Sequence, residues 1–393
     1  MNKFNRVVLV VMDSVGIGAL PDVKDFNDEL SVNTLGNISN GVGVKLPNLE
    51  SLGIGNLLEA NTISKVDTYN TNICRSMTKG KGKDTLNGHW EMMGSPVEIG
   101  FKQYIDNGFP QDLISKFEQL TGRKVVANKA ANGMQVIKEY YHEHMENGSL
   151  IVYTSADSTF QIAAHEDIVP IDELYKYCEI ASDLVQNEEY NVARIIARPF
   201  IGSFEDFSRT SNRHDYAQSP KQYTVMEKLC DNNLDSIAIG KIADIFTDKG
   251  VSKKIKTGKN ELGVNATIEE LNKNSKGLIF TNLVDFDSMY GHPRDPEGYA
   301  KCLEEFDARV PEILEALKDD DLLIITADHG NDPTFKGNDH TREYVPFIMY
   351  SKSLKGNNKL EDRLTLEDIG QTICENFGLE DTKNGTSFLQ EIL

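Results

Sequence analysis

Aspartate and histidine residues recur just after short apolar runs of the chain, a pattern that can bind a metal ion. The residues concerned are Asp13, Asp287, His292, Asp328, His329 and, in a later loop, His340. An Asp beside a His at the end of a buried strand is costly to desolvate unless one partner, such as a divalent cation, pairs with both. Mixed nitrogen and carboxylate ligands suit zinc, manganese or iron better than calcium. The alternative is that these Asp residues are ordinary turn residues and that the His side chains are solvated.

A hydroxyl that could act as a nucleophile lies in the Gly- and Lys-rich segment 77–93, MTKGKGKDTLNGHWEMM. The segment is not a Walker A loop, because Lys83 is followed by Asp84 rather than by Ser or Thr. Thr85 comes just before a predicted helix, and a hydroxyl at a helix N-terminus near a metal can be activated for attack. The alternative is that Asp84 or Thr85 only caps the helix, and the two roles are compatible.

Residues 100–219 carry polar groups of a different kind. They are Ser155 and Asp157 after a predicted strand, Arg194 and Arg198 within another, and Arg209 and Arg213 in SRTSNRHDY. Arginine binds phosphate through two parallel hydrogen bonds, although a single Arg is more often part of a surface ion pair. Lys241 follows the predicted strand 236–240, at the edge where a parallel sheet binds ligands.

The apolar runs 7–12, 278–284 and 322–326 read as buried strands of an α/β sheet. In such sheets ligands bind at the carboxyl ends of the strands, where the Asp and His residues lie. Residues 100–219 alternate predicted helices and strands and carry none of the candidate ligands. We therefore predict a core formed by 1–99 and 220–393, which binds metal and carries out catalysis, and an inserted, smaller α/β domain at 100–219, which binds substrate.

Composition narrows the function and the compartment. The 393 residues have a formal net charge of −20, which argues against a nucleic-acid partner. An anionic substrate would need a local basic pocket to oppose this charge. The five Cys residues are scattered without a C-x-x-C motif, which favours a reducing, cytoplasmic compartment over a disulfide framework. No apolar stretch reaches membrane-spanning length, so we expect no membrane partner.

Five segments together resemble, in order, the motifs of bacterial phosphopentomutases, which belong to the alkaline phosphatase superfamily. The segments are VMDSVGIG, GKDTLNGHWE, LVDFDSMYGH, ITADHGND and DHTREYVP. The resemblance extends over essentially the whole chain. It implies an alkaline phosphatase-like core sheet, with helices on both faces and an inserted cap domain, and an isomerase that interconverts ribose 1-phosphate and ribose 5-phosphate or their 2-deoxyribose forms.

The resemblance also implies roles for individual residues. Two manganese ions are expected, with zinc or another divalent metal possible. Asp13, Thr85, Asp328 and His329 would hold one ion, and Asp287, His292 and His340 would hold the other. Thr85 would be the phosphorylated residue, with a sugar bisphosphate as activator. The implied substrate contacts are Ser155, Asp157, Arg194, Arg209 and Lys241.

Three rival functions are compatible with parts of the pattern. A metal-dependent phosphatase or phosphodiesterase of the same superfamily would use the same metals but would not need Ser155, Asp157 and Arg209 in an insertion. A relative of phosphoglycerate mutase would isomerise a different substrate, and a nucleophilic Thr in GKDT fits the pentomutases better. A non-catalytic metal-binding protein would not need a nucleophile. The sequence leaves the oligomeric state open.

Overall fold

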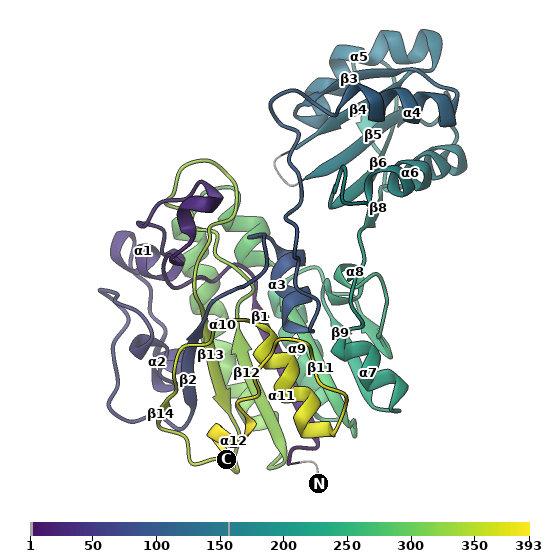
Figure 1. Cartoon of the computed structure of the whole chain (residues 1–393). Helices are drawn as coiled ribbons and strands as arrows, with labels where there is room; N and C mark the ends of the chain where they lie inside the picture. The colour runs from purple at the N-terminus through teal and green to yellow at the C-terminus, as the bar shows by residue number, and fades with distance from the viewer. Residues whose placement is uncertain (1–2, 156–157) are drawn as a thin grey trace. The chain divides into compact units, whose positions relative to one another are not determined.

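The structure is a computed structural model that describes residues 3–155 and 158–393. It divides into two compact units (Figure 1), Met1–Glu98 with Ser219–Leu393 as the core unit and Ile99–Gln218 as the inserted unit. Among the described residues, no helix is long and apolar enough to cross a membrane.

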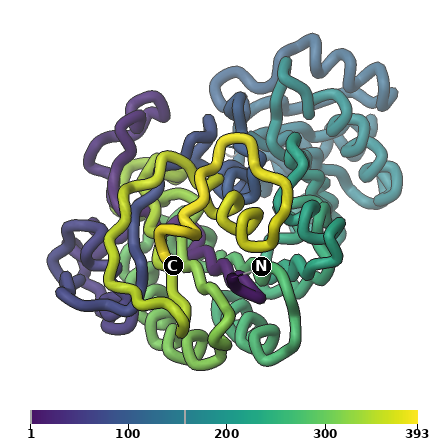
Figure 2. Tube along the Cα trace, turned by 60° about the horizontal axis from the view of Figure 1, so that its bottom comes forward, coloured from purple at the N-terminus to yellow at the C-terminus, as the bar shows by residue number. Residues whose placement is uncertain are grey.

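The core unit is built on one eight-stranded sheet within the described residues, in the order β10-β9-β11-β1-β12-β13-β2-β14. Its strands are β1 Arg6–Met12, β2 Asn72–Ser76, β9 Asp235–Ile239, β10 Lys253–Ile255, β11 Gly277–Leu283, β12 Asp321–Thr326, β13 Val345–Tyr350 and β14 Asn358–Lys359. Neighbouring strands are parallel except where β13 pairs with β12 and β2. The start of β1 and the C-terminal helix lie at one end of this unit, which Figure 2 brings toward the viewer.

Two groups of helices cover the faces of the core sheet. In the first group, three helices pack against α10 Pro296–Ala316. They are α1 Thr34–Gly41, α2 Pro47–Ser51 and α9 Asn260–Leu271. The second group is α3 Thr85–Met92, α7 Val225–Asp231, α8 Ile242–Ile245, α11 Glu367–Phe377 and α12 Leu389–Ile392. In Figure 1, α11 lies in front of the sheet and α10 behind it. Short turns are η1 Val23–Phe26, η2 Ile54–Asn56 and the π-helical η3 Phe286–Gly291.

The central strands are buried along their whole length, because both faces of the sheet are covered. The β1 sequence RVVLVVM is rich in β-branched residues, which suit a strand that packs on both sides. Strand β1 runs parallel to β11 on one side and β12 on the other. The carboxyl ends of these three strands therefore meet at one edge, and Asp13, Asp287 and Asp328 follow them there.

The inserted unit has its own sheet and its own two hydrophobic clusters. Its elements are α4 Gln111–Thr121, β3 Val125–Ala130, α5 Gly133–Asn147, β4 Leu150–Thr154, β5 Thr159–His165, α6 Ile171–Val185, β6 Arg194–Ile201, β7 Ser208–Arg209 and β8 His214–Ala217. The strand order is β3-β4-β5-β6-β7, and β8 also pairs with β6. Helices α4 and α6 pack on one face and α5 packs on part of the other.

Some sequence-based element predictions were wrong or incomplete. The apolar pattern of the sequence indicates a helix at 267–273, whereas helix α9 begins at Asn260 and ends at Leu271. The first turns of α9 carry Glu, Gly and Asn among the apolar residues, so the helical spacing of apolar residues is weak there. Strands β5 and β13 and helix α1 were not predicted. Helix α1 has the sequence TLGNISNG, whose Gly and Asn residues are typical of loops.

A buried ion pair at the other end of the core strands gives a stability prediction. Arg6 and Asp321 begin the neighbouring strands β1 and β12, and their side chains are each 1% exposed and 2.6 Å apart. We expect Asp321→Ala to lower the free energy of unfolding by about 3–5 kcal/mol, because it leaves a buried guanidinium without its carboxylate. The half-exposed pair of Arg75 and Asp362 supplies the control, since Asp362→Ala should cost about 1 kcal/mol or less. Equal shifts in urea unfolding would contradict this expectation.

Candidate metal centre

The first cluster of candidate ligands lies at the ends of β1 and β12. Asp13, Asp328 and His329 are all buried, and each offers a ligand atom within 4.8 Å of the others. The Nε2 atom of His329 lies 3.4 Å from Asp13 Oδ1 and 3.2 Å from Asp328 Oδ2. Three donors from two strand ends therefore converge on one point.

The second cluster adjoins the first through two histidine rings. Asp287, His329 and His340 also offer ligand atoms within 4.8 Å of one another, and the ring centroids of His329 and His340 are 4.4 Å apart. Asp287 Oδ1 lies 3.6 Å from His340 Nε2, and Asp287 Oδ2 lies 3.2 Å from His292 Nε2. The sequence did not indicate that His329 lies between the two groups.

Backbone carbonyl groups fix the orientation of two of these histidines. Nδ1 of His292 lies 2.7 Å from the carbonyl oxygen of Asn338, and Nδ1 of His329 lies 3.0 Å from that of Gly330. A carbonyl can only accept, so each Nδ1 carries a proton, and each Nε2 faces the carboxylates, where it can bind a cation once it has lost its own proton. Asp287 lies in η3, a π-helical turn of the kind that often occurs at functional sites.

In each carboxylate of the first cluster, one oxygen accepts a hydrogen bond and the other oxygen accepts none. Asp13 Oδ2 accepts from the side-chain amide of Asn282 at 2.8 Å, and Asp328 Oδ1 accepts from the backbone N–H of Ser14 at 3.0 Å. Asp13 Oδ1 and Asp328 Oδ2 are buried and have no hydrogen-bond partner. A buried carboxylate oxygen without a partner is costly, and a divalent cation would satisfy both oxygens. The residues present therefore fit such an ion.

The electrostatics of both clusters also favour a cation. Burial lowers the pKa of His340, but Asp287 and Asp339 more than offset it and raise the pKa to about 10. Burial likewise opposes protonation of His329, yet the charges of Asp328 and Asp13 hold its pKa well above the ordinary value. The carboxylates thus draw protons onto histidines that burial would keep neutral, and a bound metal ion would replace those protons.

Thr85 reaches the first cluster from helix α3. Asp84 is the N-cap of this helix, and its carboxylate accepts from the backbone N–H groups of Leu86 and Asn87. Thr85 is the first helical residue and is half-buried, and its Oγ1 lies 3.3 Å from His329 Nε2. Because the Asp84 side chain caps the helix, the Thr85 hydroxyl is not needed for capping, and it faces the candidate ligand His329.

Sequence reasoning missed two residues that support this arrangement. His89 is fully buried; its Nδ1 lies 2.9 Å from the carbonyl oxygen of Thr85 and 3.1 Å from Asp328 Oδ2. Its Nε2 lies 3.3 Å from the side-chain amide of Asn282, which also donates to Asp13. The available signals were the i,i+4 spacing of Thr85 and His89 and a polar Asn in the apolar run of β11.

Three predicted substrate residues of the inserted unit lie in or directly after strands of its sheet, namely Ser155 after β4, Arg194 in β6 and Arg209 in β7. The Ser155 hydroxyl lies 2.8 Å from that of Thr159, which is paired in register with Arg194. Arg209 is exposed, with one terminal nitrogen 3.4 Å from the Tyr153 hydroxyl. Asp157 lies outside the described residues.

Arg198 lies four residues after Arg194 in strand β6. Because side chains alternate along a strand, both lie on the same face of the inserted sheet. Its Nε donates to Gln161 Oε1 at 3.1 Å, and Gln161 in turn reaches the Ser155 hydroxyl. Burial, followed by the charge of Arg213, lowers the pKa of Arg198, so the cations are close enough to repel one another. Within the cluster, the carboxylate of Asp215 pairs with Arg194 and Arg213. The remaining positive charge favours an anion. The shared face could have been inferred from the period of a strand.

Lys241 lies in the core unit, directly after β9 and before α8. Its side chain is exposed, and β9 runs parallel to β11, so it stands at the carboxyl edge of the core sheet. Its contact with an anionic substrate stays a prediction.

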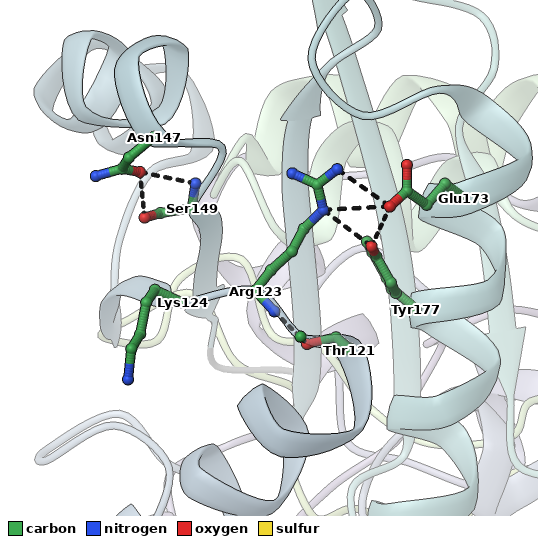
Figure 3. Close-up of a pocket in the computed structure, with 8 residues that line it drawn as sticks. Thr121, Arg123, Lys124, Asn147, Ser149, Glu173 and Tyr177 are labelled. Atoms are coloured by element: carbon green, nitrogen blue, oxygen red, sulfur yellow. Dashed lines mark hydrogen bonds and ion pairs between the residues drawn. The ribbon is translucent and has the colours of Figure 1, made fainter.

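The inserted unit also contains a cavity of about 470 Å³, shown in Figure 3. Arg123 is its central side chain, and its guanidinium donates to the Glu173 carboxylate, the Tyr177 hydroxyl and the carbonyl of Gly148. Since the guanidinium is bound by these groups, we assign no chemistry to this cavity.

Comparisons with known proteins agree with this fold. A sequence model of the metalloenzyme superfamily matches residues 5–381. The structure of phosphoglycerate mutase from Leishmania mexicana is 13% identical, with a TM-score of 0.51, over 98% of this chain and 97% of that chain. A protein from Pyrococcus horikoshii is 12% identical, with a TM-score of 0.49, over 98% and 100% of the two chains. At 13% identity the likeness to the mutase structure concerns the fold alone, and together with the family match over residues 5–381 it confirms the predicted alkaline phosphatase-like α/β fold.

Proposed function

The chain belongs to the metalloenzyme superfamily, and on that premise we propose that it is a phosphopentomutase that transfers phosphoryl groups through Thr85. The observation that carries the proposal is the position of the Thr85 hydroxyl, 3.3 Å from His329 Nε2 beside two buried carboxylates. A hydroxyl placed among metal ligands is suited to become a nucleophile. The five motifs shared with phosphopentomutases support the choice of reaction.

The proposed ligands follow the two clusters. Asp13, Thr85, Asp328 and His329 would hold one ion, and Asp287, His292 and His340 would hold the other. Divalent manganese in both places would offset the charge of a transferring phosphoryl group and favour the alkoxide form of a threonine. Asn282 and the backbone of Ser14 hold the two carboxylates of the first cluster in place through the oxygens that face away from the proposed ion.

The proposed reaction begins from phosphorylated Thr85. A free hydroxyl of the pentose phosphate attacks the phosphorus of the phosphothreonine. The bond between that phosphorus and Thr85 Oγ1 breaks, and the proton of the attacking hydroxyl is transferred to Oγ1. The product is a pentose bisphosphate. Thr85 Oγ1 then attacks the other phosphate of the bisphosphate, and the bond between that phosphorus and the sugar oxygen breaks. The Oγ1 proton passes to the sugar oxygen, which leaves the isomeric monophosphate and restores phosphothreonine. A sugar bisphosphate would supply the first phosphoryl group and so act as activator.

The cations of the inserted unit support the proposed substrate class. Arg194, Arg198 and Arg209 offer guanidinium groups that match a phosphate monoester, and Ser155 and Gln161 offer groups for sugar hydroxyls. In a chain with a net charge of −20, such a cluster gives an anion a local place to bind. Asp157 and Lys241 complete the proposed contacts.

Removing one of these arginines should weaken isomerisation. We expect Arg209→Ala to lower mutase activity by about one to two orders of magnitude, since a charge-assisted hydrogen bond is worth roughly 1.5–3 kcal/mol. Lys129→Ala is the matched control, because Lys129 is an exposed cation of the same unit that pairs with Glu139. Steady-state rates on ribose 1-phosphate test the difference, and equal rates in both variants would remove Arg209 from the substrate site.

A substrate panel tests the proposed function as a whole. The manganese-loaded protein, primed with a sugar bisphosphate, should isomerise ribose 1-phosphate and 2-deoxyribose 1-phosphate but not 3-phosphoglycerate. Hydrolysis of simple phosphate esters without isomerisation would instead identify a phosphatase or phosphodiesterase of the same superfamily.

A further inference from the structure

The loop 78–83, directly before the Asp84 cap and Thr85, is held from one side by a single buried carboxylate. Glu91 of helix α3 accepts from the backbone N–H groups of Lys79 and Gly80 and from the Thr78 hydroxyl, at 2.7–2.9 Å. Gly80 is needed for this close approach, since a Cβ there would lie 2.2 Å from Asn87 Oδ1. The loop is thereby fixed to the helix that carries Thr85.

Arg342 holds the carbonyl groups of the same loop from the other side. Its guanidinium donates to the backbone carbonyls of Thr78, Gly80 and Gly82 at 2.8–2.9 Å. Its remaining donors bind the carboxylate of Asp22 at 2.9 and 3.1 Å, so all five N–H groups are used. The side chain is 1% exposed, and its guanidinium lies 4.1 Å from the ring centroid of Phe26.

A second set of contacts links the loop to the segment that contains Arg342. Asp28 accepts from the Arg342 backbone N–H through Oδ2 and from Lys83 Nζ through Oδ1, both at 2.8 Å. Lys83 Nζ also lies 3.2 Å from the Asp339 carboxylate. His340 stands between Asp339 and Arg342 in the chain. The segment with a proposed metal ligand and the loop before the proposed nucleophile are therefore tied together twice.

We propose that Arg342 is a positioning residue that fixes the Thr85 hydroxyl relative to His340 and so sets the rate of phosphoryl transfer. The proposal rests on the proposed function in that Thr85 is taken as the nucleophile. Arg342 acts through the loop and not on the substrate. Its function depends on the planar fork of donors, because three carbonyls and one carboxylate must be bound at once.

The first test is Arg342→Lys, which keeps the charge but offers three donors in place of five. We expect kcat to fall about 10–100-fold with KM changed less than about threefold, because displacement of reacting groups by an ångström lowers the chemical step rather than substrate binding. In hydrogen exchange of the metal-free protein, the amides of Lys79 and Gly80 should exchange faster than in wild type.

Arg75→Lys is the matched control. Arg75 also binds a carboxylate, that of Asp362, and stacks on an aromatic ring, that of Tyr344, but it contacts no part of the loop. It should leave kcat and the exchange of the loop unchanged. An unchanged kcat in Arg342→Lys, or an equal loss in both variants, would overturn the proposal.

Asp22→Asn provides a second variant in case Arg342→Lys does not fold. It leaves Arg342 in place and removes only the negative charge of Asp22, which pairs with the guanidinium. The Asp22 side chain is partly exposed, whereas that of Arg342 is buried. A fall in kcat at constant KM is again expected, and a wild-type kcat would overturn the proposal. If the wild-type protein hydrolyses phosphate esters and does not isomerise, the proposed function fails, while the same variants still test Arg342 on that hydrolysis.

Discussion

Replacement of Asp328 or His340 with alanine is expected to abolish turnover and to lower the metal content of the purified protein. Each change removes a donor from one of the two clusters and leaves the remaining charges without their partner. Loss of groups that merely orient ligands costs about 10–100-fold in metal affinity or activity, so loss of a ligand should cost at least about 100-fold.

The measurement is metal content by mass spectrometry after dialysis, together with activity at saturating manganese. His142→Ala is the control for His340, because His142 is an exposed residue of the inserted unit that stacks on Phe204. It should retain its metal and its activity. Full activity in Asp328→Ala or His340→Ala would contradict the assignment of the clusters as metal sites.

Replacement of Thr85 with alanine is expected to remove phosphoryl transfer while the fold and the remaining ligands are kept. Loss of a covalent hydroxyl nucleophile lowers kcat on the order of 10³-fold or more in enzymes that depend on one. Thr85→Ser should restore part of the activity, since it returns the hydroxyl without the methyl group. The helix should remain, because Asp84 caps it.

Peptide mass spectrometry gives the direct readout of Thr85. Wild-type protein incubated with a sugar bisphosphate should carry phosphate on the peptide that contains Thr85, and Thr85→Ala should carry none. Phosphate found on another residue would assign the nucleophile elsewhere.

The fold could be predicted largely because its central strands are buried on both faces. The runs within β1 and β12 are apolar without interruption, and the run of β11 is broken only by Thr281 and Asn282. The candidate ligands follow where each strand ends. Helix α1 and strands β5 and β13 were missed for different reasons. Helix α1 is rich in Gly and Asn, β5 mixes polar and apolar residues, and β13 is apolar but carries Pro346, which is unusual inside a strand. Their structure comes from tertiary packing rather than from a local signal.

The candidate site could be predicted in its donor types but not in its contacts. Asp and His at strand ends indicate a metal, and parallel strands bring those ends together. No spacing, however, shows that His329 lies between the two groups or that His89 contacts Asp328. Arg342 is a lone arginine in the sequence, which more often means a surface ion pair. Only the fold reveals that it is buried against the loop before Thr85.

The central claim is that Thr85 returns the phosphoryl group to a sugar and not to water. The most direct test measures pentose 5-phosphate and free phosphate together, while wild-type, manganese-loaded protein consumes ribose 1-phosphate. We expect isomer formation to exceed phosphate release by a wide margin. Release of one phosphate for each ribose 1-phosphate consumed, with no isomer, would contradict the claim and make the protein a phosphatase.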